Sequence, residues 1–430
     1  MKYFFRRFGA FLEVSLGLDQ LGGNFKRFAS MHCAFNLFQG LVSVYITTLL
    51  MRVTGDGDIV KWYNLLNYLF SGLMMPVAVA VMRKQNTNLV TRIGILGFIV
   101  LYTTLLFSMN SADKMMPVLG FFSGVSGAFY WLTYSTYVSA FTEDNKRDVA
   151  LAFLGFVNGI ITLIMPALSG FIIERIPDFW GYMVVFGLAF LVAVVTILLS
   201  LRLPKHVNPE GKKDKNTYFR RSLHNIVHSA CWRYGMLAET MRGVREGTFN
   251  FLLNILLFEA ISSETLMGFN TLLTGLGTIV SFWMIGKIVK PNNRIKVMFS
   301  ATIILLAASV LPAVSLNPAT IIMFALINAF FTQFILNSSS SIFFLLVQKK
   351  AEINAREEYF SIRELMLDFG RIVGILVLFL FPKDPAGYVI AIVVLTLTQF
   401  VTVGLSKHTL KLLKREEEKE QVESGKPVEA

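Results

Sequence analysis

The sequence contains twelve stretches of mainly apolar residues, each about 20 residues long, which is the length that a helix needs to cross the hydrocarbon core of a bilayer. Short segments of turn-forming residues, such as Thr54-Gly55-Asp56-Gly57, separate these stretches. Apolar residues (A, V, I, L, M, F, W, Y and C) make up 54% of the chain and charged residues only 16%, and a soluble core cannot bury that much apolar surface. We therefore expect transmembrane helices near residues 29–52, 60–82, 89–109, 115–140, 148–174, 180–203, 236–259, 265–288, 294–314, 318–347, 359–381 and 387–405.

The basic residues are distributed unevenly along the chain. Of the 40 Lys and Arg residues, 31 lie in the two terminal segments and in alternate connections, and five lie in the other connections. Basic residues concentrate on the cytoplasmic side of membrane proteins, so both termini are predicted to be cytoplasmic, in a protein of the cell (plasma) membrane. The net charge of +12 therefore reports orientation in the membrane, and nucleic acid is not an expected partner.

The longest polar break divides the apolar stretches into six and six, which predicts five regions. Residues 1–28 form a cytoplasmic N-terminal segment, either an amphipathic helix on the inner leaflet or an unstructured basic segment. An N-terminal six-helix bundle is expected at 29–203, a cytoplasmic central loop at 204–235 and a C-terminal six-helix bundle at 236–405. The charged residues 406–430 are expected to form a disordered cytoplasmic tail.

The two halves are weakly similar to each other. Gly155-x-x-x-Gly159 in the fifth stretch lies close to the register of Gly370-x-x-x-Gly374 in the eleventh. Small residues at this spacing allow two helices to approach closely. Such spacing is common by chance, but its recurrence in matching stretches indicates an internal repeat.

The connection after the eighth stretch, residues 286–296, reads GKIVKPNNRIK and contains Gly286, Arg294 and Lys296. A weaker copy with Arg83 follows the second stretch. Together with the twelve stretches, the basic loop after the sixth and the six-plus-six repeat, this motif resembles that of the major facilitator superfamily of transporters, over residues 29–405. The present loop carries a lysine where that family usually has an acidic residue.

This resemblance implies an all-α membrane protein with 12 transmembrane helices in two six-helix bundles related by a pseudo-twofold repeat. It implies secondary active transport of a small molecule by alternating access, with spans 1, 4, 7 and 10 lining a central cavity. The expected protein is a monomer in the lipid bilayer, is not an enzyme and needs no cofactor. A transporter-like sensor or scaffold, which signals through residues 204–235 or the charged tail, is the alternative.

Two predicted spans contain clusters of ionisable residues. Each such group costs at least about 2.5–3.5 kcal/mol in hydrocarbon, so it usually faces a partner or a cavity. The charges of each cluster sum to zero, so the clusters either couple or gate transport or form static ion pairs near the cytoplasmic interface. The clusters are Glu239, Arg242, Arg245 and Glu246 in span 7 and Arg363, Glu364, Asp368 and Arg371 in span 11.

The expected coupling ion is the proton, because buried carboxylates can take up and release protons. Glu246 is the first candidate, as the deepest carboxylate of span 7, and Asp368 is the second. His32 is a weaker candidate, because a histidine near a helix start more often makes an interfacial hydrogen bond.

Polar residues on the cavity-lining spans are candidates for substrate binding. In membranes such residues are often simple interhelical hydrogen-bonding groups, so the prediction rests on several of them meeting at one cavity. The substrate class stays open: the arginines favour an anionic head group, whereas the many Phe and Met residues suit a lipophilic compound. The candidates are His32, Asn36, Gln39, Tyr130, Tyr134, Asn250, Asn328 and Asn337.

Enzyme motifs are weak or absent in the sequence. Gly124-Val125-Ser126-Gly127 matches an intramembrane protease motif, but that chemistry needs a histidine near the serine and only His32 lies in a span. The chain has no phosphate-binding loop, so ATP is not its direct energy source. Its two cysteines, Cys33 and Cys231, are too few for a four-ligand zinc site, so no metal site is expected.

Overall fold

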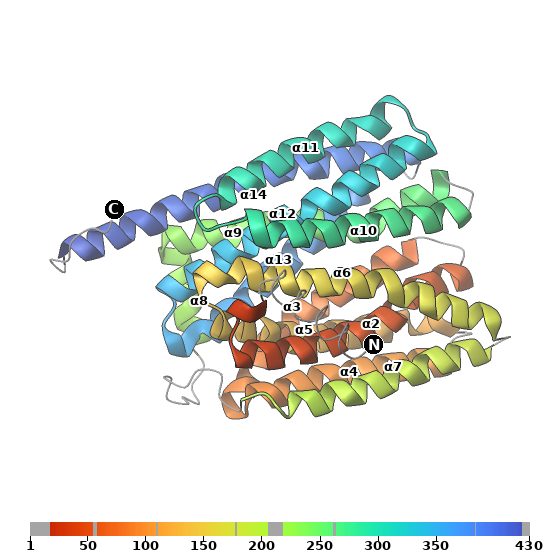
Figure 1. Cartoon of the computed structure of the whole chain (residues 1–430), viewed down its shortest axis with the longest axis horizontal. Helices are drawn as coiled ribbons and strands as arrows, with labels where there is room; N and C mark the ends of the chain where they lie inside the picture. The colour runs from red at the N-terminus through yellow and green to blue at the C-terminus, as the bar shows by residue number, and fades with distance from the viewer. Residues whose placement is uncertain are drawn as a thin grey trace.

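The structure is a computed structural model that describes residues 18–54, 58–108, 111–176, 179–204, 218–260, 264–382 and 384–423. Within these ranges the chain is almost entirely helical and contains no β-strand. The long helices run side by side along the longest axis of the molecule (Figure 1). The first 17 residues of the predicted N-terminal segment lie outside the described residues.

Six long helices make up the N-terminal half, and their positions match the first six predicted spans. They are α2 (Gly23–Thr54), α3 (Asp58–Lys84), α4 (Thr87–Phe107), α5 (Ala112–Phe141), α6 (Asp144–Arg175) and α7 (Phe179–Ser200). The C-terminal half consists of a short helix, α8 (Phe219–His228), and six long ones: α9 (Ala230–Ala260), α10 (Glu264–Ile288), α11 (Arg294–Val314), α12 (Pro318–Lys350), α13 (Arg356–Leu378) and α14 (Pro385–Glu423).

The helices have the length and composition of membrane spans. Among the described residues, eight helices are long and apolar enough to cross a membrane: α3, α4, α5, α6, α7, α11, α12 and α14. The charged clusters predicted from the sequence lie on two of the remaining helices, α9 and α13, which lowers their mean hydropathy. The protein is therefore an integral membrane protein with an all-helical fold.

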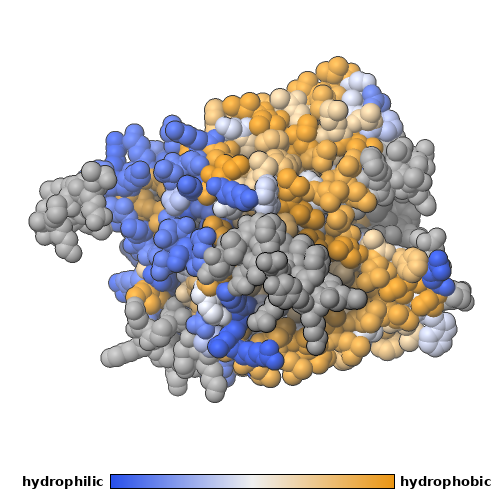
Figure 2. Space-filling model, in the orientation of Figure 1, coloured by the Kyte–Doolittle hydropathy of each residue, from blue (hydrophilic) through white to orange (hydrophobic). Residues whose placement is uncertain are grey.

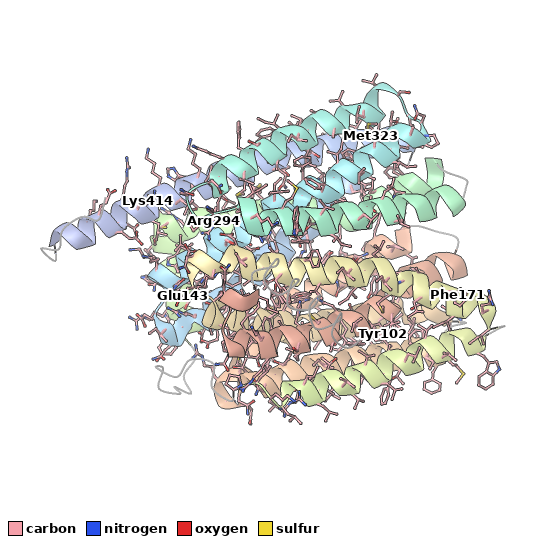
Figure 3. All side chains as sticks on the ribbon, in the orientation of Figure 1. Tyr102, Glu143, Phe171, Arg294, Met323 and Lys414 are labelled. Atoms are coloured by element: carbon pink, nitrogen blue, oxygen red, sulfur yellow. The ribbon has the colours of Figure 1, made fainter. Side chains whose placement is uncertain are left out.

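One end of the bundle is largely hydrophilic, and the visible surface between the two ends is mainly apolar (Figure 2). Glu143, Arg294 and Lys414 lie toward this end, whereas Phe171 and Met323 lie toward the other (Figure 3). We call the hydrophilic end, which carries α8, the basic end. It corresponds to the side that the Lys and Arg distribution predicts to be cytoplasmic.

The two halves contact each other mainly along two helix pairs, α3 with α13 and α6 with α10. The predicted glycine motif of α6 lies in the second pair. A Cβ atom added at Gly155 would lie 2.2 Å from the ring of Phe282, and one added at Gly159 would lie 3.0 Å from Ile279. The absence of side chains at these two positions therefore lets α6 and α10 pack closely across the interface.

Glycines also define the closest helix pair within the C-terminal half. A Cβ at Gly370 would lie 2.1 Å from the carbonyl oxygen of Thr240, and one at Gly374 would lie 2.0 Å from that of Val244. The facing glycines of α9, Gly243 and Gly247, are equally crowded by α13. The glycine motif on α13 was predicted from the sequence, whereas the facing glycine pair on α9 was not.

Two predicted region boundaries differ from the observed structure. The segment 406–430 was expected to be disordered, but α14 continues to Glu423. Its extension packs onto the basic end, because Leu413 is buried and two carboxylates of α14 pair with the end of α12, Glu417 with Lys349 and Glu416 with Lys350, both at 3.1 Å.

The predicted central loop 204–235 is also partly helical. Helix α8 occupies residues 219–228 and α9 begins at Ala230, before the predicted span. One face of α8 is covered by protein, since Ile226 is buried and Asn225 donates a hydrogen bond to Tyr359 of α13 at 3.1 Å. A short amphipathic helix needs such packing to be stable.

The packing of α9 against α13 predicts a strong effect of the smallest substitution. Gly370→Ala should lower the free energy of unfolding by about 1–3 kcal/mol, because the added methyl group overlaps a backbone oxygen. Thermal denaturation of the purified protein in detergent measures this change. Gly187→Ala is the matched control, because nothing lies within 4 Å of a Cβ at that position. Equal melting temperatures for the two variants would contradict the proposed crowding.

Candidate functional site

A cavity of about 420 Å³ lies between the two halves. Helices α2, α5 and α6 line it from the N-terminal half, and α10 and α12 line it from the C-terminal half. Its lining includes amide, aromatic and hydroxyl side chains, among them Asn36, Gln39, Trp131, Asn158, Gln333, Asn337 and Ser340. This volume falls in the range of small-molecule sites.

The structure brings five of the eight predicted binding residues to this cavity. They are His32, Asn36, Gln39, Tyr134 and Asn337. Tyr130 lies behind the cavity wall, because it is 1% exposed and its hydroxyl is 2.7 Å from Nδ1 of His32. Asn328 lies at a different pocket. The side chain of Asn250 lies outside the described residues.

Aromatic rings hold His32 in place. Its ring centroid is 4.7 Å from that of Tyr134 and 6.0 Å from that of Tyr130, and Phe35 stacks on Tyr130 at 3.5 Å. Gln39 is also engaged, since it accepts a hydrogen bond from Tyr102. The N-terminal wall of the cavity is therefore a rigid surface of rings and amides.

The predicted charged clusters of α9 and α13 form one network. Glu239 accepts from Arg363 at 2.8 Å and from Ser339 of α12 at 2.9 Å, and it pairs with Arg242 at 3.2 Å. Arg363 also pairs with Glu364 at 2.5 Å. These groups are at most 7% exposed, so the ion pairs replace the solvation that burial removes.

The network continues along the same two helices. Glu246 pairs with Arg242 at 3.4 Å and with Arg371, and Arg371 pairs with Asp368 at 2.7 Å. One oxygen of Asp368, Oδ2, has no hydrogen-bond partner although the residue is only 1% exposed. Asp368 lies where α13 meets the N-terminal half, because a Cβ added at Gly72 of α3 would be 3.7 Å from the Cβ of Asp368.

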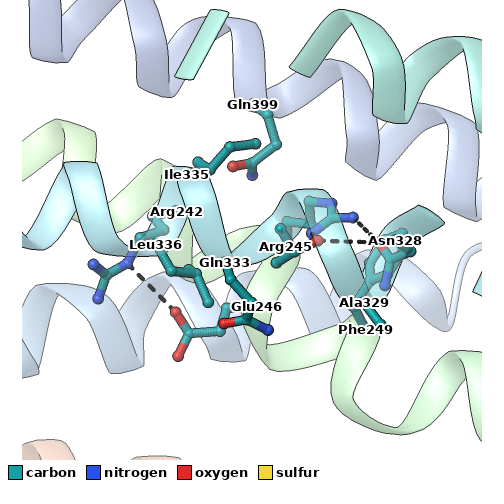
Figure 4. Close-up of a pocket in the computed structure, with 11 residues that line it drawn as sticks. Arg242, Arg245, Glu246, Phe249, Asn328, Ala329, Gln333, Ile335, Leu336 and Gln399 are labelled. Atoms are coloured by element: carbon teal, nitrogen blue, oxygen red, sulfur yellow. Dashed lines mark hydrogen bonds and ion pairs between the residues drawn. The ribbon is translucent and has the colours of Figure 1, made fainter. Parts of the chain in front are cut away.

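A second, smaller pocket of about 140 Å³ lies within the C-terminal half, between α9, α12 and α14 (Figure 4). Arg242, Arg245 and Glu246 line it together with Asn328 and Gln399. Gln333 and Leu336 line both this pocket and the central cavity, so the two spaces adjoin.

Ion pairs join the two halves at the basic end. Arg294, the predicted motif residue at the start of α11, binds Asp148 of α6 at 2.7 Å and Asp144 at 3.1 Å. Ser341 of α12 donates to the same Asp148 at 2.5 Å. Of the other predicted motif residues, Lys296 is exposed, and the nearest neighbour of a Cβ at Gly286 would be Ala152, at 3.6 Å.

A second set of contacts at the basic end connects α3 with the start of α13. Arg83 binds Glu357 at 3.0 Å, and it also binds Glu358 and the carbonyl oxygen of Asn354. Burial raises the pKa of Glu357, and the Arg83 guanidinium acts in the opposite direction. The halves are therefore held together by buried charges at this end.

The acidic partners of Arg294, Asp144 and Asp148, were not predicted from the sequence. Asp144 and Asp148 are four residues apart at the start of α6, which places them on one helix face. That spacing beside a connection was a usable signal. Their partner Arg294 is 146 residues from Asp148 in the chain, so the pairing itself could not be predicted.

Comparison with known proteins agrees with this architecture. The family model of the Major Facilitator Superfamily matches residues 28–375. The chain belongs to this superfamily of membrane transporters and is not an enzyme. Its sequence is 24% identical over 344 residues to the uncharacterized protein YqgE of Bacillus subtilis, a match that covers 80% of this chain and 79% of YqgE.

Solved structures have the same fold at low sequence identity. The fucose:proton symporter FucP of E. coli superposes with a TM-score of 0.69 at 12% identity, covering 90% of this chain and 98% of FucP. The human organic anion transporter MFSD10 (TETRAN) gives 0.67 at 14% identity and covers 90% and 99%. A bacterial homologue of the iron transporter ferroportin, in an outward-facing state, gives 0.67 at 12% and covers 91% and 100%.

The contact between Arg294 and Asp148 should contribute strongly to stability. Asp148→Asn removes one of the two negative partners of a guanidinium that is 1% exposed and leaves the other, Asp144, in place, so we expect a loss of about 1.5–3 kcal/mol in the free energy of unfolding. Chemical denaturation of the parent and the variant measures it.

The exposed pair of Lys349 and Glu417 provides the control. Both side chains are at least 34% exposed, so Glu417→Gln should cost less than about 1 kcal/mol. If both variants lose the same small amount, the pair at the basic end does not hold the halves together.

Proposed function

We propose that this protein is a proton-coupled secondary transporter that moves a small molecule by alternating access across the cell membrane, as a monomer, with its basic end in the cytoplasm. The observation that carries the proposal is the position of Asp368. A buried carboxylate with one unpartnered oxygen lies at the contact between the halves and is linked by ion pairs to the residues beside the cavity. A proton that binds there would change the charge of the network at the interface that must move.

The number of arginine partners favours Asp368 over Glu246, the first candidate from the sequence. Glu246 contacts two guanidinium groups, Arg242 and Arg371, whereas Asp368 contacts only Arg371. Neutralising Glu246 would remove a counter-ion from two cations at once, the buried Arg242 and the partly buried Arg371. Neutralising Asp368 would leave Arg371 paired with Glu246, so its protonation disturbs the network less.

Helix α12 provides a route between the substrate and the network. Ser340 lines the cavity. Its hydroxyl oxygen accepts a hydrogen bond from Arg242 at 2.9 Å and a second, longer one from Arg363 at 3.5 Å. A molecule in the cavity that contacts Ser340 would compete with these arginines. Occupancy of the cavity would therefore alter the same network that the proton alters, which is the requirement for coupling.

Opening the basic end requires the contacts between the halves to break. These contacts include Arg294 with Asp148 and Arg83 with Glu358. Since Ser341 and the side chain of Asn337 also reach Asp148, a movement of α12 is transmitted to this contact. In the proposed cycle, the same helix, α12, lines the substrate cavity and contacts the ion pair that must break when the basic end opens.

The protonation of Asp368 can be tested without knowing the substrate. We expect infrared difference spectra, recorded while the pH is changed, to contain the carbonyl band of a protonated carboxylic acid, and Asp368→Asn should remove that band. In proteoliposomes the same variant should lose accumulation driven by a pH gradient, in an uptake screen across sugars, carboxylates and lipophilic cations.

Asp384→Asn is the matched control, because Asp384 caps the first turn of α14 through the backbone N–H of Gly387 and an asparagine side chain can do the same. This variant should keep both the band and the accumulation. A band that persists in Asp368→Asn but disappears in Glu246→Gln would reassign the proton to Glu246, and a band unaffected by either change would refute coupling through this network.

A further inference from the structure

Arg245 differs from the other three arginines of the charged clusters. Arg242, Arg363 and Arg371 each contact two carboxylates, drawn from Glu239, Glu246, Glu364 and Asp368. Arg245 is 3% exposed and forms no ion pair with any carboxylate of the described residues. It is thus a buried cation without a counter-ion of its own.

The partners of Arg245 are uncharged. Its guanidinium donates to the hydroxyl of Thr332 at 3.2 Å and to the side-chain oxygen of Asn328, and its centre lies 3.9 Å from the ring of Phe249. Its Nε atom has no hydrogen-bond partner. Neutral oxygens and a ring orient the guanidinium but do not balance its charge, and a buried unbalanced charge costs several kcal/mol.

The space next to Arg245 can hold a small charged group. The smaller pocket of about 140 Å³ is lined by Arg245, together with the ion-paired Arg242 and Glu246. It adjoins the central cavity at Gln333 and Leu336 (Figure 4). The central cavity itself is lined by rings and amides, and its described lining contains no Asp, Glu, Lys or Arg. A molecule that occupies both spaces would place its charge at Arg245 and its uncharged body against Trp131 and Tyr134.

We propose that Arg245 binds the carboxylate of an organic monoanion whose ring-shaped, uncharged body lies in the central cavity. One bound negative charge balances the one unpaired cation, and the guanidinium geometry matches a carboxylate. The coupling of this site to the proton rests on the proposed function. When Asp368 is neutral, the paired network holds three arginines and three carboxylates, so the charge of Arg245 is left to the bound anion.

Stability without any ligand distinguishes this role from a structural one. If Arg245 mainly ties α9 to α12, Arg245→Gln should lower the melting temperature. If it is a ligand site, removing an unbalanced buried charge should leave the melting temperature of the ligand-free protein unchanged or higher. Arg175→Gln is the matched control, because Arg175 is exposed and its guanidinium lies over the ring of Phe171, 4.8 Å from the ring centroid.

Binding is measured by thermal shift of the full-length protein with benzoate and glucuronate, each against its neutral counterpart, benzamide and glucose. Both carboxylates should raise the melting temperature more than the neutral compounds, and acetate, which lacks a ring, should bind more weakly. Arg245→Gln should weaken carboxylate binding by about 10- to 100-fold, with Arg245→Lys in between, and Arg175→Gln should bind as the parent does.

Three results would overturn the proposal: no preference for carboxylates over neutral compounds, equal binding by Arg245→Gln, or a ligand-free Arg245→Gln that melts below Arg175→Gln. These measurements use no pH gradient. Loss of the Asp368 carbonyl band would refute the proton site of the proposed function, whereas loss of anion binding with an intact Asp368 carbonyl band would refute this inference alone.

Discussion

The presence of eight charged side chains inside the C-terminal half, six of them buried, is the constraint on which the rest of the structure depends. Ionised groups in an apolar bundle usually face an opposite charge or a cavity, and seven of these eight lie within contact distance of an opposite charge. The glycines of α9 and α13, Gly243 with Gly247 and Gly370 with Gly374, allow this by bringing the two backbones together. At that separation Arg363 reaches Glu239 and Arg371 reaches Glu246 across the helix pair. The glycine motifs and the charged residues are therefore parts of one arrangement.

Three consecutive positions on α12 connect sites that face in different directions. Successive residues of a helix are rotated by about 100°, so a run of neighbours points to several sides of the helix axis. Ser339 contacts Glu239 of α9, Ser340 lines the cavity, and Ser341 contacts Asp148 of the other half. Short hydroxyl side chains suit this position, because they bond to charged partners without filling the cavity. This run is where the cavity, the charged network and the contact between the halves meet.

The fold could be predicted from the sequence, but the pairing within the site could not. Hydropathy locates most of the long helices, because lipid requires an apolar surface on each span, and the predicted stretch 294–314 has the bounds of α11. The residues of the charged clusters were identified because buried charges are rare in such spans. Which carboxylate keeps a free oxygen depends on distances between helices, so the sequence favoured Glu246 although Asp368 has the unpartnered atom. The extension of α14 was missed because its high charge predicts a solvated segment, whereas Leu413 is buried and Glu416 and Glu417 pair with the end of α12.

The two halves contribute different side chains near the cavity, uncharged rings and amides from one and paired charges from the other, and this difference suits a rocking movement. The N-terminal wall is built from rings and amides around His32 and Trp131, which can hold a substrate body without carrying charge. The described ion pairs of the C-terminal network join α9 and α13 to each other, so this half can rotate as a unit with its charges still paired. The charges that would change partners in the proposed cycle, at Arg83 and Arg294, lie at the basic end, where water can replace the lost contacts. A transporter built in this way avoids exposing bare ions to lipid during its cycle, because the energetic cost of separation falls at the polar surface of the membrane.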